Sequence, residues 1–288
     1  MKATAALKEL AERREAVQVP GAANALFARL IEDLGFEAVY VTGAGIANMH
    51  LGAPDIGLTT LTEVAETVSA IADAVAIPLI VDADTGFGNA INVTRTVRVL
   101  ERSGASAIQL EDQVSPKKCG HFTGKQVIPL PEMIEKLKAA TDARRDPDLQ
   151  IIARTDARAV EGLDRALERA HAFEEAGADI IFIEAPASIA ELERIAREVA
   201  SPQIVNIVFG GKTPDPGREA LKRMRFSIAL YANAALQAAL KGAADVLSAL
   251  RREGSLNSVS GVLATFEERQ RIVAKDRWDA LEAKYRTD

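Results

Sequence analysis

The sequence predicts an α/β fold of the (β/α)8 barrel type, a TIM-type barrel, in a single domain over residues 1–288. Eight short apolar runs alternate with amphipathic segments, the connections are short, and no break in composition divides the chain. Continuous apolar runs are typical of strands buried on both faces, and strand–helix alternation indicates a parallel sheet. A doubly wound open sheet is the structural alternative, but eight regular repeats favour closure into a barrel.

The predicted strands are short and evenly spaced along the chain. They cover residues 16–21, 37–43, 77–84, 106–112, 149–157, 178–186, 202–210 and 225–232. Helical patterns between them include residues 23–35, 61–76, 91–104 and 162–177, and three of these four close on glycine, a common helix terminator.

Two segments lie outside the eight repeats. Residues 2–16 predict an N-terminal helix, and residues 255–288 predict a C-terminal helical arm that carries one long helix rich in both charge signs. An appended amphipathic helix of this kind packs either on a neighbouring subunit, exchanged between copies, or on its own barrel as a solvated cap. The sequence leaves both arrangements open.

Charge and composition narrow the class of partner. The net charge is −6 and no basic tract is present, which argues against nucleic acid as the main partner but allows a small anionic substrate. No apolar run approaches the roughly 20 residues of a membrane helix, and the N-terminus lacks the apolar run of a signal peptide. One cysteine cannot form an internal disulfide, so we expect a reducing, cytoplasmic location.

Acidic and polar residues stand at successive strand ends, where a barrel places its chemistry. Several carboxylates suit a hard divalent cation, and Mg²⁺ keeps part of its water shell, so we expect Mg²⁺, with Mn²⁺ as the alternative. A single acid at a strand end more often caps the next helix, but several at successive ends favour a metal site. The residues at these ends are Asp82, Asp84, Glu111, Arg154, Glu184 and Asn206.

Other common chemistries find no support. The chain lacks a histidine-rich zinc set, a GxxxxGK[ST] phosphate loop and a lysine that ends an apolar strand. These absences from the sequence argue against zinc, P-loop nucleotide and Schiff-base chemistry.

The stretch "LEDQVSPKKCGHFTGKQVIP", residues 110–129, holds the only cysteine of the chain, Cys119. Cysteines outside disulfides are usually buried small hydrophobes, but this segment is too polar for a core. Lys117, Lys118 and His121 flank Cys119, and neighbouring positive charge lowers the pKa of a thiol. We interpret residues 115–125 as a mobile lid that carries an acid–base thiol.

The segments "DADTGFGN", "LEDQVSPKKCGH" and "ARTDA" together resemble the isocitrate lyase/phosphoenolpyruvate mutase superfamily, over nearly the whole chain. The "KKCGH" loop is similar to that of the lyase branch, which includes 2-methylisocitrate lyase, 2,3-dimethylmalate lyase, the petal death protein and oxaloacetate hydrolase. Phosphonate-forming mutases have a different, Asn-bearing sequence in this loop.

The resemblance implies a Mg²⁺-dependent carbon–carbon lyase that splits a 2-hydroxy-di- or tricarboxylate into an α-keto acid, such as pyruvate, and a second carboxylate. It also implies a homotetramer with exchanged C-terminal helices. By residue match, the metal set is Asp82, Asp84 and Glu111, acting mostly through waters. The catalytic set is Cys119 as proton donor, Tyr40 as base or relay, Arg154 and His121. The substrate-binding set is Thr42, Gly43, Ala44, Asp55, Lys117, Gly120, Glu184 and Asn206.

Two segments depart from the family pattern and bear on the substrate. "NIVFGGKTP", residues 206–214, places Val208 and Phe209 where 2-methylisocitrate lyases have a polar segment, and "LYANAAL", residues 230–236, lacks the usual Tyr-Pro. We therefore expect a distal pocket that suits a smaller or more apolar substrate, such as 2,3-dimethylmalate. Oxaloacetate hydrolase or decarboxylase is the alternative activity, and a phosphonate-forming mutase is a weaker one.

Overall fold

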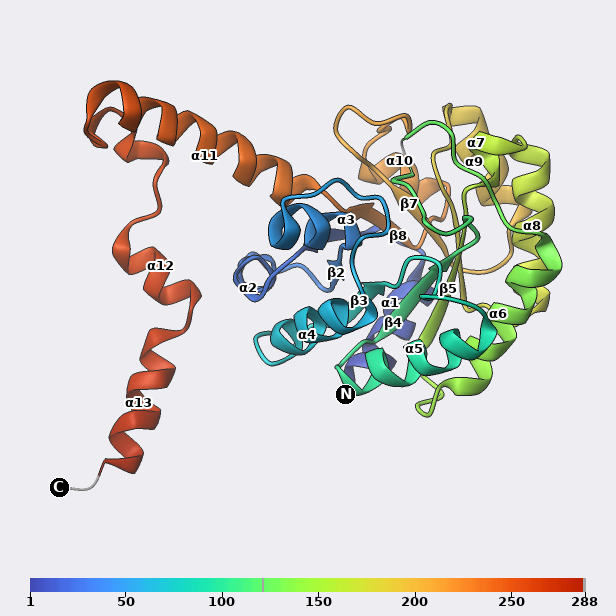
Figure 1. Ribbon diagram of the computed structural model, residues 1–288, viewed down its shortest axis with the longest axis horizontal. Helices are drawn as coiled ribbons and strands as arrows, with labels where there is room; N and C mark the ends of the chain where they lie inside the picture. Colours follow the sequence, from blue (N-terminus) through green and yellow to red (C-terminus); the bar gives the residue numbers. More distant parts are fainter. Residues whose placement is uncertain (121, 287–288) are drawn as a thin grey trace.

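The computed structural model describes residues 1–120 and 122–286, and its centre is a closed barrel of eight parallel strands (Figure 1). The strands follow one another in chain order, and β8 pairs with β1 to close the barrel. The predicted (β/α)8 barrel is therefore confirmed. The strands are β1 (Val17–Ala22), β2 (Val39–Val41), β3 (Leu79–Asp82), β4 (Ala107–Glu111), β5 (Gln150–Thr155), β6 (Ile180–Ile183), β7 (Gln203–Asn206) and β8 (Ile228–Tyr231).

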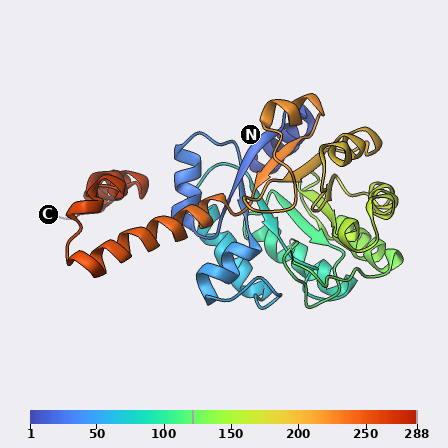
Figure 2. The same cartoon turned by 90° about the horizontal axis from the view of Figure 1, so that it is seen from above.

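Helices follow the strands in turn and surround the barrel (Figures 1 and 2). Three short helical segments, α3 (Gly43–Ile46), the π-helical turn Ala47–Leu51 and α7 (Ala157–Val160), lie in connections at the carboxyl ends of strands. The longer helices after the eight strands are α2 (Ala25–Asp33), α4 (Leu61–Ala72), α5 (Ala90–Arg102), α6 (Leu130–Ala143), α8 (Leu163–Glu175), α9 (Ile189–Glu198), α10 (Arg218–Arg223) and α11 (Ala234–Glu253).

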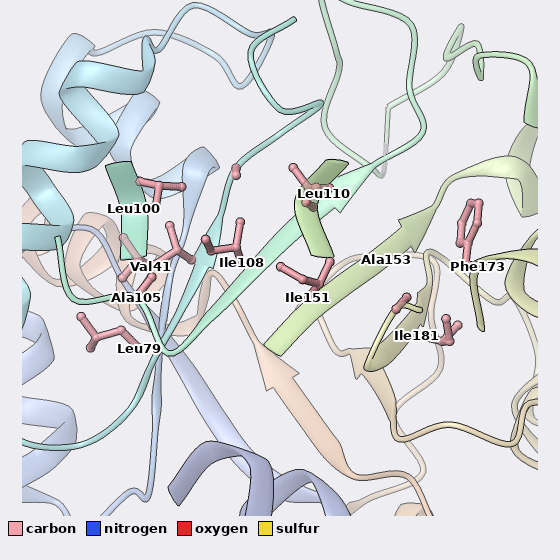
Figure 3. Packing of buried hydrophobic residues seen from close by; sticks show 14 of the residues in the cluster. Val41, Leu79, Leu100, Ala105, Ile108, Leu110, Ile151, Ala153, Phe173 and Ile181 are labelled. Carbon is pink, nitrogen blue, oxygen red and sulfur yellow. The ribbon is translucent and has the colours of Figure 1, made fainter. Parts of the chain in front are cut away.

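Each strand contributes to two cores, because successive side chains point to opposite faces of the sheet. Ile108 of β4 and Ile151 of β5 belong to the outer core between the barrel and its helices, together with Leu100 of α5 and Phe173 of α8 (Figure 3). Burial on both faces explains why the strands read as continuous apolar runs.

The inner core fills the barrel and extends to the N-terminal helix α1 (Ala3–Arg13). Leu7 and Leu10 of α1 join inward-facing side chains such as Ile80 and Ile152. Lys8 of α1 forms an ion pair, at 3.2 Å, with Asp148, which precedes β5. Helix α1 therefore closes the amino end of the barrel, and the carboxyl end is left for the site.

Helix α11, which leads into the C-terminal arm, leaves the barrel and extends to one side (Figures 1 and 2). A 3₁₀ turn (Asn257–Val262), α12 (Phe266–Ile272) and α13 (Lys275–Tyr285) follow. The prediction of one long helix here is wrong, because Ala274, with φ at 54°, separates α12 from α13. A left-handed residue of this kind interrupts a right-handed helix.

The arm, residues 255–288, contacts α2 of its own barrel through α12. Arg271 of α12 forms a forked ion pair with Asp33 at the end of α2, and the Nη2–Oδ2 distance is 2.9 Å. By contrast, Ala249 is the one buried residue of α11, and α13 has none over its described residues. None of the helices in the described part of the chain has the length and apolar character needed to cross a membrane.

Candidate active site

A cavity of about 30 Å³ lies at the carboxyl ends of the strands. This space holds about two water molecules. Its lining residues are Tyr40, Thr42, Ala44, Asp55, Asp82, Cys119, Gly120, Arg154, Phe182, Glu184, Asn206, Leu230, Ala232 and Asn233.

Most of the predicted site residues belong to this lining. Gly43, Asp84, Glu111 and Lys117 do not line the cavity, but hydrogen bonds or ion pairs tie each of them to the lining residues. His121 lies outside the described residues. The strand ends thus bring together side chains that are far apart in the sequence.

The turn after β2 supplies backbone to the site. Thr42 caps α3, because its Oγ1 accepts a hydrogen bond from the Gly45 N–H at 3.2 Å. The next N–H, that of Gly43, donates to Oδ2 of Asp82 at 3.3 Å. A Cβ at Gly43 would lie 3.0 Å from the same oxygen, so this close approach depends on the absence of a side chain.

Tyr40 and Asp82 form a buried pair. Burial raises the pKa of Tyr40 well above its usual value, and the adjacent Asp82, which accepts its hydrogen bond, raises it further. The phenol therefore stays protonated at neutral pH and suits the role of a relay. The other carboxylate oxygen of Asp82, Oδ1, accepts from the Asp84 N–H at 3.2 Å and from Nε2 of Gln109 at 3.3 Å.

Lys117 places a positively charged side chain of the Cys119 loop against the acidic residues of the site. Its Nζ lies 2.5 Å from Oδ1 of Asp55 and 2.7 Å from Oδ1 of Asp84. Burial alone lowers the pKa of this lysine, but Asp84, Glu111 and the other nearby acids raise it well above its usual value. Burial raises the pKa of Asp84 to about 6, although Lys117 acts in the opposite direction.

Arg154 and Glu111 face each other across neighbouring strands. The Nη1–Oε2 distance is 3.1 Å, and no side chain or backbone group of the described residues gives the Glu111 carboxylate a hydrogen bond. Burial raises the pKa of Glu111 well above its usual value, and Arg154 offsets part of this effect. The guanidinium also lies 5.4 Å from the ring centre of Phe182, a cation–π contact.

Asp156 fixes the orientation of Arg154. Its Oδ2 accepts from Nε at 3.0 Å and its Oδ1 from Nη2 at 3.2 Å, a forked arrangement. Asp112, the last residue before the Cys119 loop, accepts from the Asp156 N–H at 2.9 Å and from Oγ1 of Thr155 at 2.7 Å. The end of β5 is therefore held by the side chain of Asp112, which directly follows β4.

The loop that carries Cys119 is anchored at its base and at its tip. Gln113 pairs with Val127 and exchanges two hydrogen bonds with the backbone of Lys118, at 2.8 and 3.0 Å. The Cys119 N–H donates to the Asp55 carbonyl at 3.1 Å. This arrangement places Cys119 in the lining of the cavity rather than in solvent.

The balance of buried charge fits a divalent cation. Six buried carboxylates, Asp55, Asp82, Asp84, Glu111, Asp156 and Glu184, surround three buried cations, Lys117, Lys125 and Arg154. Among the described residues, no three His, Cys, Asp or Glu side chains come close enough to ligate a metal ion directly. Mg²⁺ retains several waters, so this donor set fits a hydrated ion held through water.

The distal wall differs in part from the expected one. Phe209 does not face the cavity, because its side chain is 89% exposed, and that prediction is wrong. The prediction that the segment after β8 reaches the pocket is confirmed, since Ala232 and Asn233 line it together with Leu230. Directly after β7, Ile207 is buried in the outer core, and the loop then carries Phe209 into solvent.

Gln109, Phe182 and Lys125 are among the residues that contact the site and were not predicted from the sequence. A signal existed for Phe182, which stands two residues before Glu184 on the same strand and so shares its face. Gln109 stands two residues before Glu111 in the same way. Lys125 gave no such signal, because it lies in a loop without periodicity.

Comparison with known proteins agrees with this geometry. The family model described as phosphoenolpyruvate phosphomutase matches residues 7–251. The chain belongs to the phosphoenolpyruvate mutase/isocitrate lyase superfamily. The resemblance drawn from the sequence motifs is thereby confirmed.

The similar proteins include characterised lyases. The chain is 44% identical over 287 residues to a 2,3-dimethylmalate lyase of Eubacterium barkeri, a match that covers 100% of this chain and 99% of the relative. It is 47% identical over 262 residues to a 2-methylisocitrate lyase of Aeropyrum pernix, covering 91% and 84%. The crystal structure of a 2,3-dimethylmalate lyase matches with a TM-score of 0.92 at 31% identity, covering 99% and 95%. The protein is a carbon–carbon lyase of this superfamily.

The close packing of Gly120 gives a test of the closed loop. A Cβ at this position would lie 2.6 Å from Nη2 of Arg154 and 2.7 Å from Cγ of Glu184, so Gly120→Ala is expected to lower kcat/KM of this lyase by about 10²-fold while the fold is retained. Gly242→Ala is the matched control, because nothing lies within 4 Å of its Cβ. Steady-state kinetics and circular dichroism measure both variants, and equal activity would contradict the packing argument.

Proposed function

We propose that this lyase cleaves the C2–C3 bond of a 2-hydroxydicarboxylate of the 2,3-dimethylmalate type, to give pyruvate and propionate, with Mg²⁺ or Mn²⁺ as cofactor. The observation that carries the proposal is that Cys119, Arg154 and Tyr40 line one small cavity at the strand ends. A proton donor, an oxyanion partner and a proton relay are the groups that such a cleavage requires.

The shape and chemistry of the distal wall favour this substrate class. Phe182, Leu230 and Ala232 present apolar surface to the cavity. Among the described lining residues, Arg154 is the one cation, so a third carboxylate, as in 2-methylisocitrate, would have no cation of its own. A methyl group in place of that carboxylate suits the apolar wall.

Amide groups are placed to bind a second carboxylate. Asn206 and Asn233 line the cavity, and within the described part of the chain their Oδ1 atoms accept no hydrogen bond. Each side-chain amide also carries two donor hydrogens, which can turn toward a carboxylate. At the other end, Arg154 and the turn at Gly43 and Ala44 would bind the keto-acid half of the substrate.

The cation is proposed to lie beside Asp82, Asp84 and Glu111, held mostly through water molecules. When bound, it supplies positive charge next to the oxygen that becomes the carbonyl of pyruvate. Arg154 stabilises the same developing charge from the protein side, because Asp156 fixes its guanidinium in place.

The chain's own residues then move two protons. The C2 hydroxyl loses its proton to the Tyr40–Asp82 pair as the C2–C3 bond breaks, and the electron pair of that bond remains on C3 of the departing carboxylate. The Cys119 thiol gives its proton to C3, which yields propionate, and later recovers a proton from the site. The closed loop excludes water, which would otherwise compete as the proton source.

The substrate is tested by incubating the protein with (2R,3S)-2,3-dimethylmalate, 2-methylisocitrate and oxaloacetate, each with Mg²⁺ and each with EDTA. We expect pyruvate to form fastest from 2,3-dimethylmalate, to stop in EDTA, and to resume when Mg²⁺ or Mn²⁺ is restored. Oxalate and acetate from oxaloacetate, with no pyruvate from the branched substrates, would instead identify an oxaloacetate hydrolase. Conversion of phosphoenolpyruvate, followed by phosphorus NMR, would identify a mutase.

The role of Cys119 is tested by Cys119→Ser. A serine hydroxyl is a far weaker acid than a thiol, so kcat is expected to fall on the order of 10²-fold or more. Mn²⁺ binding, followed by electron paramagnetic resonance, is expected to be unchanged, since Cys119 is not in the proposed metal set. Full activity of the variant would remove Cys119 from the mechanism.

We propose also that a second copy of the chain covers the arm, in the homotetramer that the family resemblance implies. Large exposed apolar side chains gather there, among them Trp278, which is 57% exposed, and Val262, which is 74% exposed. Exposed apolar surface of this extent is typical of protein–protein interfaces. Phe266 and Tyr285 are further examples in the arm, and Leu240 and Leu247 lie on the preceding helix α11.

Removal of residues 255–288 tests this assembly. We expect the full chain to sediment as an oligomer and the shortened chain to sediment as a smaller species. The barrel should remain folded, because α12 contributes one forked ion pair to it and α13 buries no residue. A shortened chain that keeps the oligomeric mass of the full chain would contradict the proposal.

A further inference from the structure

Lys125, at the end of the Cys119 loop, is buried against the barrel. Its side chain is 1% exposed, and its Nζ lies 2.5 Å from Oδ1 of Asp156. The same Nζ donates to the Gly120 carbonyl at 2.5 Å, next to Cys119. A single ammonium group therefore joins the tip of the loop to the end of β5.

Asp156 extends this connection to the group that stabilises the oxyanion. Its Oδ1 accepts from Nζ of Lys125 and, at 3.2 Å, from Nη2 of Arg154. Its backbone is held by Asp112, so the carboxylate has a fixed position. The orientation of Arg154 and the closure of the loop thus depend on the same acceptor.

We propose that Lys125 is a positioning residue that latches the Cys119 loop closed and, through Asp156, aligns Arg154 with the closed loop. The inference rests on the proposed function in one respect, the role of Cys119 as proton donor. The latch itself depends only on the contacts of Lys125 with Asp156 and Gly120. Membership of the lyase class does not account for these contacts.

The physical reason is the cost of burying charge. A buried ammonium group is stable only when it is paired and hydrogen-bonded. Lys125 reaches both of its partners, the fixed Asp156 carboxylate and the Gly120 carbonyl, only when the loop is closed. Partial closure would bury the lysine without its full set of partners. The loop is therefore expected to close as a unit, with Cys119 and Arg154 reaching their positions together.

Lys118 provides a matched comparison within the same loop. Its Nζ donates at 2.9 Å to the carbonyl of Gly124, and this contact is exposed and lies within the loop. The lysine does not reach the barrel and does not line the cavity. Loss of its charge changes the loop's net charge as much as loss of Lys125 does, but leaves the proposed latch intact.

The reaction rate of Cys119 measures loop opening without any substrate, because this residue is the only thiol in the chain. We expect Lys125→Met to speed the reaction of the full-length protein with dithiodipyridine, an uncharged reagent, by about tenfold or more, since hydrogen bonds to charged groups contribute this much to an equilibrium. Lys118→Met is expected to react within about twofold of the wild type.

The direction of this change separates the latch from a simple charge effect. Loss of a nearby positive charge raises the pKa of a thiol and slows its reaction, whereas loss of the latch speeds it. A Lys125→Met rate equal to or below that of the wild type would overturn the proposal. An equal increase in Lys118→Met would overturn it too, because the effect would then not be specific to Lys125.

Steady-state kinetics give a second measurement. A purely structural role of Lys125 would not change the balance between kcat and KM. With Lys125→Met, kcat is expected to fall more than KM rises, because the closed loop and Arg154 act after the substrate has entered, and Lys125→Arg is expected to recover part of kcat. If Lys125→Met does not fold, Lys125→Gln is measured in the same thiol assay. Because that assay needs no turnover, failure of the proposed lyase reaction leaves the result on the latch interpretable.

Discussion

The carboxylate of Asp156 is the point on which the mouth of the barrel depends. It is fully buried, and burial by itself raises the pKa of this group, yet Arg154 and Lys125 hold the pKa below its usual value. The anion is therefore maintained by two cations, one from its own strand and one from the loop. A cation at this depth is stable only when it is paired with an anion.

The same electrostatic logic extends across the site. Lys117 reaches Asp55 and Asp84, so the loop delivers two lysines to a cluster that otherwise has an excess of buried carboxylates. Loop closure neutralises charge as well as covering the cavity. A hydrated divalent cation would reduce the remaining excess, which is the physical argument for the cofactor proposed above.

Prediction succeeded where chemistry follows strand topology. Arg154, Glu184 and Asn206 converge because parallel strands in a barrel end on one rim, and a correct list of strands is enough to place them together. Prediction failed where the local sequence pattern carries no information on the direction of a side chain or the conformation of the backbone. Phe209 points to solvent although its segment follows a strand. The break between α12 and α13 comes from the positive φ of Ala274, and an alanine in the sequence gives no sign of such a conformation.

The sequence alone determined the barrel, the rim of acids and the family, because apolar periodicity and motif identity are local properties of the chain. The tertiary structure decided which residues of the Cys119 loop act inside the site. Lys117, Lys118 and Lys125 are equivalent in composition, and only folding separates the two that are buried from the one that stays exposed. The choice depends on an acceptor, Asp156, that lies 31 residues further along the chain than Lys125 and meets it only when the barrel closes.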